Sequence, residues 1–363
     1  MKTAAAIRRA SKQAQSQMRE LSAQVEQELL SLYEQSADEV RAAIRAAAGP
    51  GDTVAREHLQ GLLRQIEDII GRLGYGVDAQ VLDAIDRAAA LGVQPLTAQG
   101  VAAVGGAQAV LESAAAMRVA ESAVRFVRSF QAADGLVLSD RLWRLTQGAK
   151  EVLARAVSNA VVQGWSAAQA VADLAYAGRP VPPDLAARLG AGKADALVRA
   201  ADLLTSGDGS ALWQADRVMR TEINRAHGEA YMEGAARASG FVGFRFLLSP
   251  QHPEPDICDL LASQNLHGLG AGVYPSREQC PWPAHPNTLS FVVAVFDDEV
   301  TDADRAGKET ELQALQRLAP DVRAGALGKT KAEYFDQGLL TRNAIRSPLR
   351  AVRARLQRQG VAV

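Results

Sequence analysis

The sequence predicts a mainly α protein: an elongated, alanine-rich helical N-terminal region, followed by a small α+β domain with a long proline-rich loop. Of the 69 alanines, 54 precede residue 241, whereas only 5 of the 14 prolines do. Alanine favours the helix and proline interrupts it, so this distribution predicts long helices that pack closely. Segments with the alternating aromatic and aliphatic pattern of strands follow Gly240.

The first helix is expected over residues 5–48, because apolar residues recur at steps of three, four and seven. Gly49, Pro50 and Gly51 end it, and Asp52 is a candidate N-cap for a second helix over 52–73. An extended helical hairpin follows from these two segments. Further helices are expected at 78–92, 97–131, 139–163 and 166–176, with a loop or hinge at 178–190 and another helix at 210–238.

Two strands are expected after these helices, at 241–247 and 289–296, and we expect them to be neighbours in one sheet. The segment between them, which includes the loop 250–288, is too long for a simple hairpin turn. The predicted division of the chain is a helical region at 1–205, an α+β core at 206–300 and a helical segment with a basic tail at 301–363.

Charge and composition exclude several classes of protein. The 40 lysines and arginines nearly balance the 41 acids, so no global field attracts the chain to nucleic acid or a membrane. Two cysteines are too few for a disulfide-built secreted scaffold. The N-terminal segment lacks the apolar region of a signal peptide, and the apolar run 291–296 is too short to span a bilayer. We therefore expect a soluble protein without a membrane span.

Cysteine and histidine residues concentrate in the loop. Five of the seven in the chain lie between residues 252 and 285, and seven of the 14 prolines lie between 250 and 286. Such a stiff, irregular loop has little regular structure to stabilise it, and Zn²⁺ prefers thiolate and imidazole ligands. The candidate ligands of a structural zinc are His252, Cys258, Cys280 and His285.

Other interpretations of the same residues stay open. Asp256 is placed to orient His252 from outside the ligand set. A disulfide between Cys258 and Cys280 is the second interpretation, and ordinary buried thiols with scattered histidines are the third. His267 is interpreted as a turn residue, while His58 and His227 lie on helices away from the cluster.

The C-terminal tail is basic. From residue 342 onward it has six arginines and no acid, so it is a candidate contact for phosphate groups or an acidic protein surface. On a continuous helix, Arg346, Arg350 and Arg353 would share one face. A solvated, frayed terminus is the alternative. The six residues are Arg342, Arg346, Arg350, Arg353, Arg355 and Arg358.

Several motifs occur in a recognisable order. Gly164-Trp165-Ser166 precedes Arg220-Thr221-Glu222, which is followed by Phe244-Arg245-Phe246, by His252-Pro253 through Cys258, and by His285-Pro286-Asn287. Over residues 150–345 this order resembles the phage head morphogenesis family, typified by the Mu F protein and the SPP1 minor head protein. The sequence differs from the family pattern where Asp259-Leu260-Leu261 follows Cys258 and where Thr288-Leu289-Ser290 follows Asn287.

The resemblance implies a minor capsid protein of a tailed phage or prophage, without catalytic activity. It implies a place in the virion, inside the head near the portal, after assembly in the host cytoplasm. The portal and the major capsid protein are the partners it implies, and the protein would act in head assembly and in DNA packaging or ejection. The basic tail adds packaged DNA as a partner.

Three rival hypotheses remain open. A metal-dependent hydrolase or nuclease would use the region of His252, Cys258 and His285. A toxin-like transferase would use Arg220 and Glu222. A helical adaptor without any connection to phage heads would bind no portal ring.

Overall fold

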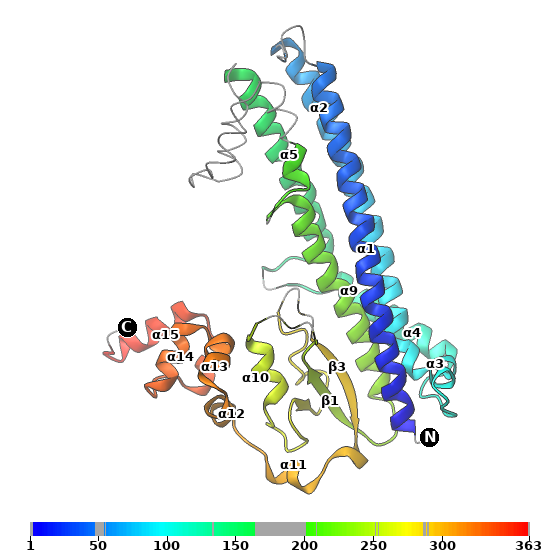
Figure 1. Cartoon of the computed structure of the whole chain (residues 1–363), viewed down its shortest axis with the longest axis vertical. Helices are drawn as coiled ribbons and strands as arrows, with labels where there is room; N and C mark the ends of the chain where they lie inside the picture. Colours follow the sequence, from blue (N-terminus) through cyan, green and yellow to red (C-terminus); the bar gives the residue numbers. More distant parts are fainter. Residues whose placement is uncertain are drawn as a thin grey trace. The chain divides into compact units, whose positions relative to one another are not determined.

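The computed structural model describes residues 3–47, 54, 56–132, 134–163, 201–207, 209–250, 252, 254–285, 288 and 290–361. The expected mainly α fold with a small sheet is confirmed (Figure 1). The expected helix at 166–176, the hinge at 178–190 and the break at 49–52 lie outside the described residues.

The chain divides into two compact units, each assembled from segments that are distant in the sequence. Unit 1 consists of residues 1–16, 89–123 and 224–363, and unit 2 of residues 17–88 and 124–223. The division of the chain predicted from the sequence, with boundaries after residues 205 and 300, stays a prediction.

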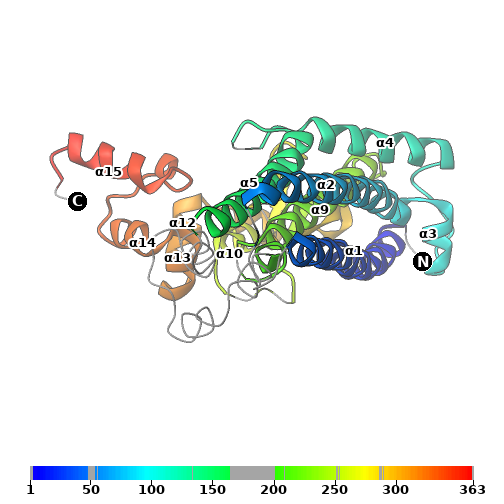
Figure 2. The same cartoon turned by 90° about the horizontal axis from the view of Figure 1, so that it is seen from above.

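Helix α1 (Thr3–Ala47) confirms the first expected helix, and Figure 2 views it nearly end on. It needs no internal break because its apolar residues keep helical spacing along its whole length. The stripe is buried at Ile7, Ala14, Met18, Leu21, Val25, Leu29, Val40 and Ile44.

Helix α2 (Arg56–Val93) is continuous, so the expected helix end near residue 73 is wrong. The reason is packing between helices of unit 2. A Cβ atom on Gly74 would lie 2.6 Å from Oγ1 of Thr146, and one on Gly76 would contact Leu32. These glycines allow neighbouring helices to approach closely, and they do not end the helix.

The expected helix at 97–131 is also wrong. The chain forms η1 (Gln94–Leu96), α3 (Ala98–Ala103) and α4 (Ser113–Ser129), with a turn in which Gly105 has a φ of +77°. The backbone amides of Val110 and Leu111 both donate to the Leu96 carbonyl, which returns the chain toward η1. Because this segment is rich in alanine, its sequence pattern did not predict the break between α3 and α4.

Two later helices confirm the sequence prediction closely. They are α5 (Leu138–Gln163) and α9 (Ala211–Ala235); a short η2 (Ala201–Leu204) lies between them in the sequence. In unit 2, Arg141 of α5 donates to the carboxylate of Glu222 at 2.7 Å, and Glu222 is fully buried. A buried carboxylate is tolerated because this cation compensates it.

The sheet of unit 1 has the order β2-β1-β3, with both pairings antiparallel. Strands β1 (Phe241–Leu247) and β3 (Phe291–Phe296) confirm the two expected neighbours, and β2 (Val273–Tyr274) is a third strand that the sequence did not predict. The α9 side chain of Tyr231 accepts a hydrogen bond from the Ala294 amide, which fixes α9 against β3.

The C-terminal segment consists of short helices that share a core with the loop. Leu260 of the loop packs in one hydrophobic cluster with Leu315, Leu327 and Leu356. Residues 301–361 are therefore joined to the sheet through the loop. The elements that follow β3 are η3 (Asp297–Glu299), α11 (Asp302–Ala306), α12 (Glu311–Arg317), α13 (Pro320–Leu327), α14 (Lys329–Asp336), η4 (Arg342–Ala344) and α15 (Leu349–Arg358).

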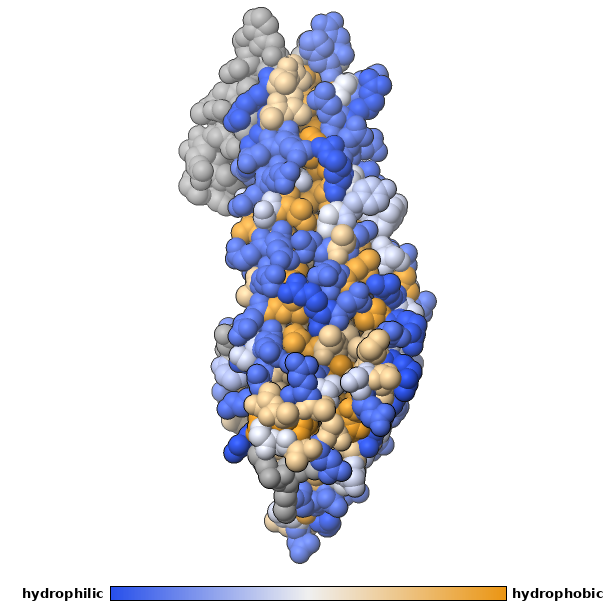
Figure 3. Space-filling view, turned by 90° about the vertical axis from the view of Figure 1, so that its right-hand side faces the viewer, coloured by the Kyte–Doolittle hydropathy of each residue, from blue (hydrophilic) through white to orange (hydrophobic). Residues whose placement is uncertain are grey.

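Among the described residues, none of the helices combines the length and apolar character that a bilayer-spanning helix needs. On the face in Figure 3, hydrophobic residues lie in narrow strips and spots between hydrophilic ones. This pattern is the one expected of helices that each bury a single apolar stripe.

Candidate metal centre

The loop between β1 and β3 contains regular structure, which corrects the expectation of an irregular segment. Helix α10 (Ile257–Ser263) begins at a capping box formed by two aspartates. Oδ1 of Asp256 accepts from the Cys258 amide at 2.6 Å, and Oδ2 of Asp259 accepts from the Asp256 amide at 2.8 Å. The Asp-x-x-Asp spacing thus begins a helix at Asp256 and places Cys258 in its first turn.

This helix start brings three different ligand atoms together. Sγ of Cys258 lies 3.3 Å from Nε2 of His285, and the same Nε2 lies 3.0 Å from Oδ2 of Asp256. The ligand atoms of these three residues all lie within 4.8 Å of one another. Cys258 is buried, whereas the side chains of His285 and Asp256 are each 35% exposed, so the group is accessible from one side.

A second group adjoins the first and shares Asp256 with it. Nε2 of His252 lies 3.0 Å from Oδ2 of Asp259 and 3.7 Å from Oδ1 of Asp256. His252, Asp256 and Asp259 also meet the spacing of a metal-binding group. The two groups together offer sulfur, imidazole nitrogen and carboxylate oxygen, a mixture that suits Zn²⁺.

Cys280 belongs to neither group, and its assignment as a fourth ligand is corrected. It is a buried free thiol, as is Cys258, so the two cysteines form no disulfide. Arg277, three residues earlier, binds the carboxylate of Glu229 on α9, with Nε to Oε2 at 2.8 Å. This ion pair connects the loop to α9.

Packing explains the position of Cys280. The Trp282 ring lies against Gly228 of α9, where an added Cβ would come within 2.0 Å of the ring. Its indole N–H donates to the Ser290 carbonyl at 2.9 Å. Anchoring of Trp282 against α9 holds the nearby Cys280 outside the Cys258 group.

Both thiols are neutral at physiological pH. Burial raises the pKa of the Cys258 thiol to about 11, although hydrogen bonds with Ser290 and Thr288 act in the opposite direction. Burial likewise raises the pKa of Cys280 to about 12, partly offset by the Arg277 charge. A neutral thiol is a poor nucleophile, so the Cys258–His285 contact does not make an activated cysteine without a cation.

The remaining loop and helix histidines lie outside these groups, as the sequence indicated. The His267 ring stacks edge-on against Tyr274, with the centroids 5.8 Å apart. His58 is exposed on α2. His227 on α9 is partly exposed but its Nε2 is buried, and this desolvation lowers its pKa to about 4.

The six C-terminal arginines do not form one surface. Helix α15 begins at Leu349, so Arg346 lies before it and does not share a helix face with Arg350 and Arg353. Pro348 precedes the helix and disfavours helical geometry at Ser347, which explains the interruption. Arg346 instead lies 3.4 Å from the carboxylate of Glu311.

Arg220 and Glu222, the pair considered for a transferase, lie in different environments. Arg220 binds Asp216 at 2.9 Å and Glu26 at 2.8 Å, all within unit 2. Glu222 is fully buried beside Arg141. The two residues therefore serve separate ion pairs.

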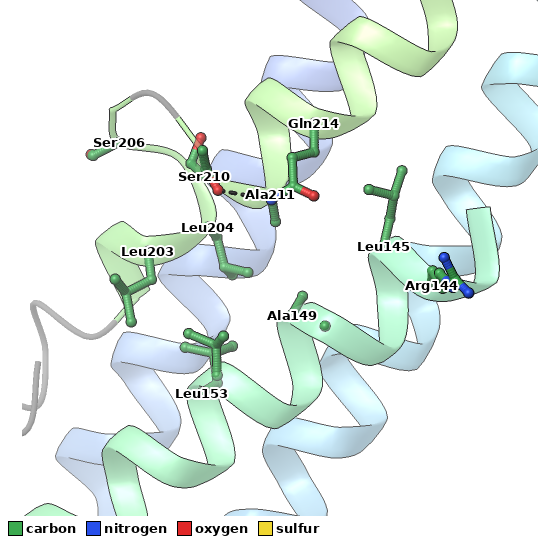
Figure 4. A pocket seen from close by; sticks show the side chains of 13 residues that line it. Arg144, Leu145, Ala149, Leu153, Leu203, Leu204, Ser206, Ser210, Ala211 and Gln214 are labelled. Carbon is green, nitrogen blue, oxygen red and sulfur yellow. Dashed lines mark hydrogen bonds between the residues drawn. The ribbon is translucent and has the colours of Figure 1, made fainter. Parts of the chain in front are cut away.

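A cavity of about 260 Å³ lies in unit 2 between α5, η2 and the start of α9 (Figure 4). Leu153, Leu203 and Leu204 gather at one end, and Arg144 lies at the other. The side-chain amide of Gln214 donates a hydrogen bond to the Gly209 carbonyl at 2.9 Å. The described residues that line the cavity include no cysteine, histidine or acid.

The sequence identified three residues of the combined group, His252, Cys258 and His285. It placed Asp256 outside the ligand set and did not single out Asp259. The available signal was the Asp-x-x-Asp capping box, which predicts that both carboxylates lie at one helix start.

Comparisons of this chain with protein-family models, curated proteins and solved structures found no match.

Proposed function

We propose that this chain is a minor head protein of a tailed phage or prophage, which acts without catalysis in head assembly and DNA packaging or ejection. The observation that carries the proposal is the order of elements from α9 to β3. Helix α9 with the Arg220-Thr221-Glu222 motif leads to β1, to the Cys258 and His285 loop and to β3 in the same sheet. This is the order that the resemblance to the head morphogenesis family implies.

The loop would hold one structural zinc ion through His252, Asp256, Cys258 and His285. The fit rests on Asp256, Cys258 and His285, whose ligand atoms lie within 4.8 Å of one another; His252 would be supplied by the adjoining group, which shares Asp256. Four protein ligands complete a tetrahedral structural site and leave no position for a reacting water. Asp259, which contacts Nε2 of His252, would orient that ring. Metal binding would displace the Cys258 proton, because the thiolate is the ligand.

The portal and the major capsid protein are the proposed partners, and the interior of the head near the portal is the proposed location in the virion. During assembly the protein would be in the host cytoplasm. The long helices α1 and α2 supply extended surfaces for docking on a ring, and mixed charges line their outer sides.

Quantitative peptide mass spectrometry on purified particles tests this proposal. The chain is expressed with its neighbouring genes, and its copies are counted against the major shell protein after nuclease treatment and washing. A low, fixed copy number supports a minor head component. Loss of the protein on washing, to the level of an abundant host cytoplasmic protein, overturns it.

One observation favours a second candidate, a metal-dependent hydrolase or nuclease. Asp256 and His285 are each 35% exposed, and three protein ligands with one open position are typical of a catalytic zinc. DNA hydrolysis that survives purification and disappears in His285→Ala, with protein fold retained, would support this candidate against the structural one.

A further inference from the structure

The C-terminal helices pack around a shared hydrophobic cluster, so this segment is not a frayed tail. Val352 and Leu356 of α15 are buried in the cluster that also contains Leu260 of α10 and Leu315 of α12. In Figure 1, α15 lies at the end of the C-terminal helices that is away from β1. Side chains on its solvent side therefore have defined positions within unit 1.

Three acids of the C-terminal segment pair with arginines other than those on the solvent side of α15. No aspartate or glutamate follows Asp336 in the chain. The ion pairs of the three acids are Glu309 with Arg317 at 2.7 Å, Glu311 with Arg346 at 3.4 Å and Asp336 with Arg323 at 2.9 Å.

Four arginines remain exposed without an acidic partner among the described residues. Arg350, Arg353 and Arg358 lie along the solvent side of α15, and Arg342 lies in the preceding η4. We call these four residues the arginine surface. Arg355 differs from them, because its guanidinium is half-buried and donates to Oγ1 of Thr341 at 2.6 Å.

We propose that the arginine surface binds the phosphate backbone of double-stranded DNA without reading its sequence. All four cations are arginines, whose planar guanidinium matches phosphate oxygens with two parallel hydrogen bonds. Arg350 and Arg353 are three residues apart and are therefore neighbours on the helix surface. This inference extends the proposed function by naming a partner for one surface of the protein.

Two features favour duplex over single-stranded nucleic acid. Binding of single strands without sequence preference relies on aromatic side chains on which the bases stack. No aromatic residue follows Phe335 in the sequence, so neither η4 nor α15 carries such a side chain. The net charge of the whole chain is −1, so binding depends on this local contact and is strongly weakened by salt.

Fluorescence anisotropy with the purified full-length protein and a labelled, mixed-sequence DNA duplex tests the inference. About four phosphate contacts predict a slope of log K against log salt of about −3 to −4. They also predict a loss of roughly 100-fold in affinity between about 50 and 200 mM salt. The single-stranded form of the same DNA is expected to bind less tightly.

The triple variant Arg350→Gln/Arg353→Gln/Arg358→Gln should reduce the magnitude of the slope by about 3, and Arg353→Gln alone by about 1. The matched control is Arg19→Gln/Arg45→Gln/Arg64→Gln, which removes the same charge from exposed arginines of unit 2. Circular dichroism and thermal melting check that each variant is folded.

Equal slopes in the parent and the α15 variant would overturn the inference, as would equal losses in the two triple variants. A surface that binds an isolated portal protein but not duplex DNA would overturn it as well. Because the assay uses purified protein and DNA, its failure is distinguishable from absence of the chain in particles.

Discussion

Sγ of Cys258 lies 3.3 Å from Nε2 of His285, although the two residues are 27 positions apart in the sequence. Cys258 is held by the first turn of α10, while His285 comes from the return of the chain toward β3. Asp256 bonds to both sides, through the Cys258 amide and through the His285 ring. One capping aspartate therefore joins the two ends of the loop.

Cys258→Ser is expected to abolish stoichiometric zinc binding and to lower the melting temperature, because the ligand set loses its only sulfur. Cys280→Ser is the matched control, since Cys280 is equally buried but lies outside both groups. Elemental analysis by mass spectrometry and thermal melts give the two readouts. Retention of zinc in Cys258→Ser, or its loss only in Cys280→Ser, would contradict the proposed site.

Asp259→Asn is expected to weaken zinc affinity about 10- to 100-fold without abolishing it, since Asp259 contacts the His252 ring. Competition with a zinc chelator measures this change. Asp304→Asn serves as a control, because Asp304 occupies the same capping position in α11, away from the metal group. Equal zinc affinity in the Asp259 variant and the parent would remove Asp259 from the site.

Stability is expected to fall between pH 6.5 and pH 4 because of His227. Burial lowers the pKa of this histidine from 6.5 to about 4, so the unfolded chain binds more protons in this range. The stability that neutral His227 contributes is present above pH 6.5 and is lost, by about 3 kcal/mol, as the pH falls to 4.

Urea unfolding of the parent and of His227→Gln across this pH range checks the prediction. The variant should show a flatter pH dependence, whereas the exposed control His58→Gln should follow the parent. Parallel curves for all three proteins would mean that His227 is not the responsible group.

Two glycines of α2 should respond oppositely to alanine. A Cβ on Gly92 would lie 2.3 Å from the His227 carbonyl oxygen, whereas one on Gly71 would have no heavy atom within 4 Å. Gly92→Ala should destabilise the protein by about 1–3 kcal/mol. Gly71→Ala should stabilise it by about 0.5–1 kcal/mol through helix propensity. Denaturant midpoints distinguish them, and the same sign for both changes would contradict the packing.

Glu222→Gln is expected to cost about 3 kcal/mol, because it leaves the Arg141 cation, whose side chain is only 13% exposed, without its buried carboxylate partner. The exposed Glu333→Gln on α14 should change stability by less than about 0.5 kcal/mol. Equilibrium unfolding in urea measures both values. A small effect of Glu222→Gln would show that the pair contributes little to unit 2.

Local pattern was sufficient to predict helices α1, α5 and α9 and both long strands. The apolar stripe of α1 and the β-type residues around Phe244 are properties of short windows, and burial in the structure follows them. Sequence segments with few large apolar residues predicted the ends of helices less well. The breaks after α3 and the continuity of α2 through Gly74 depend on contacts with Leu96 and Thr146, which lie outside any local window.

The sequence by itself determined the helical class, the two neighbouring strands and the clustering of cysteine and histidine in the loop between them. Only the tertiary structure decided which of these residues meet. Trp282 packs against Gly228 and holds Cys280 aside, while the capping box draws Asp256 and Asp259 toward His252. Helix and strand periodicity depend on neighbours within a few residues, whereas a metal group depends on where distant segments pack, and spacing alone does not encode that.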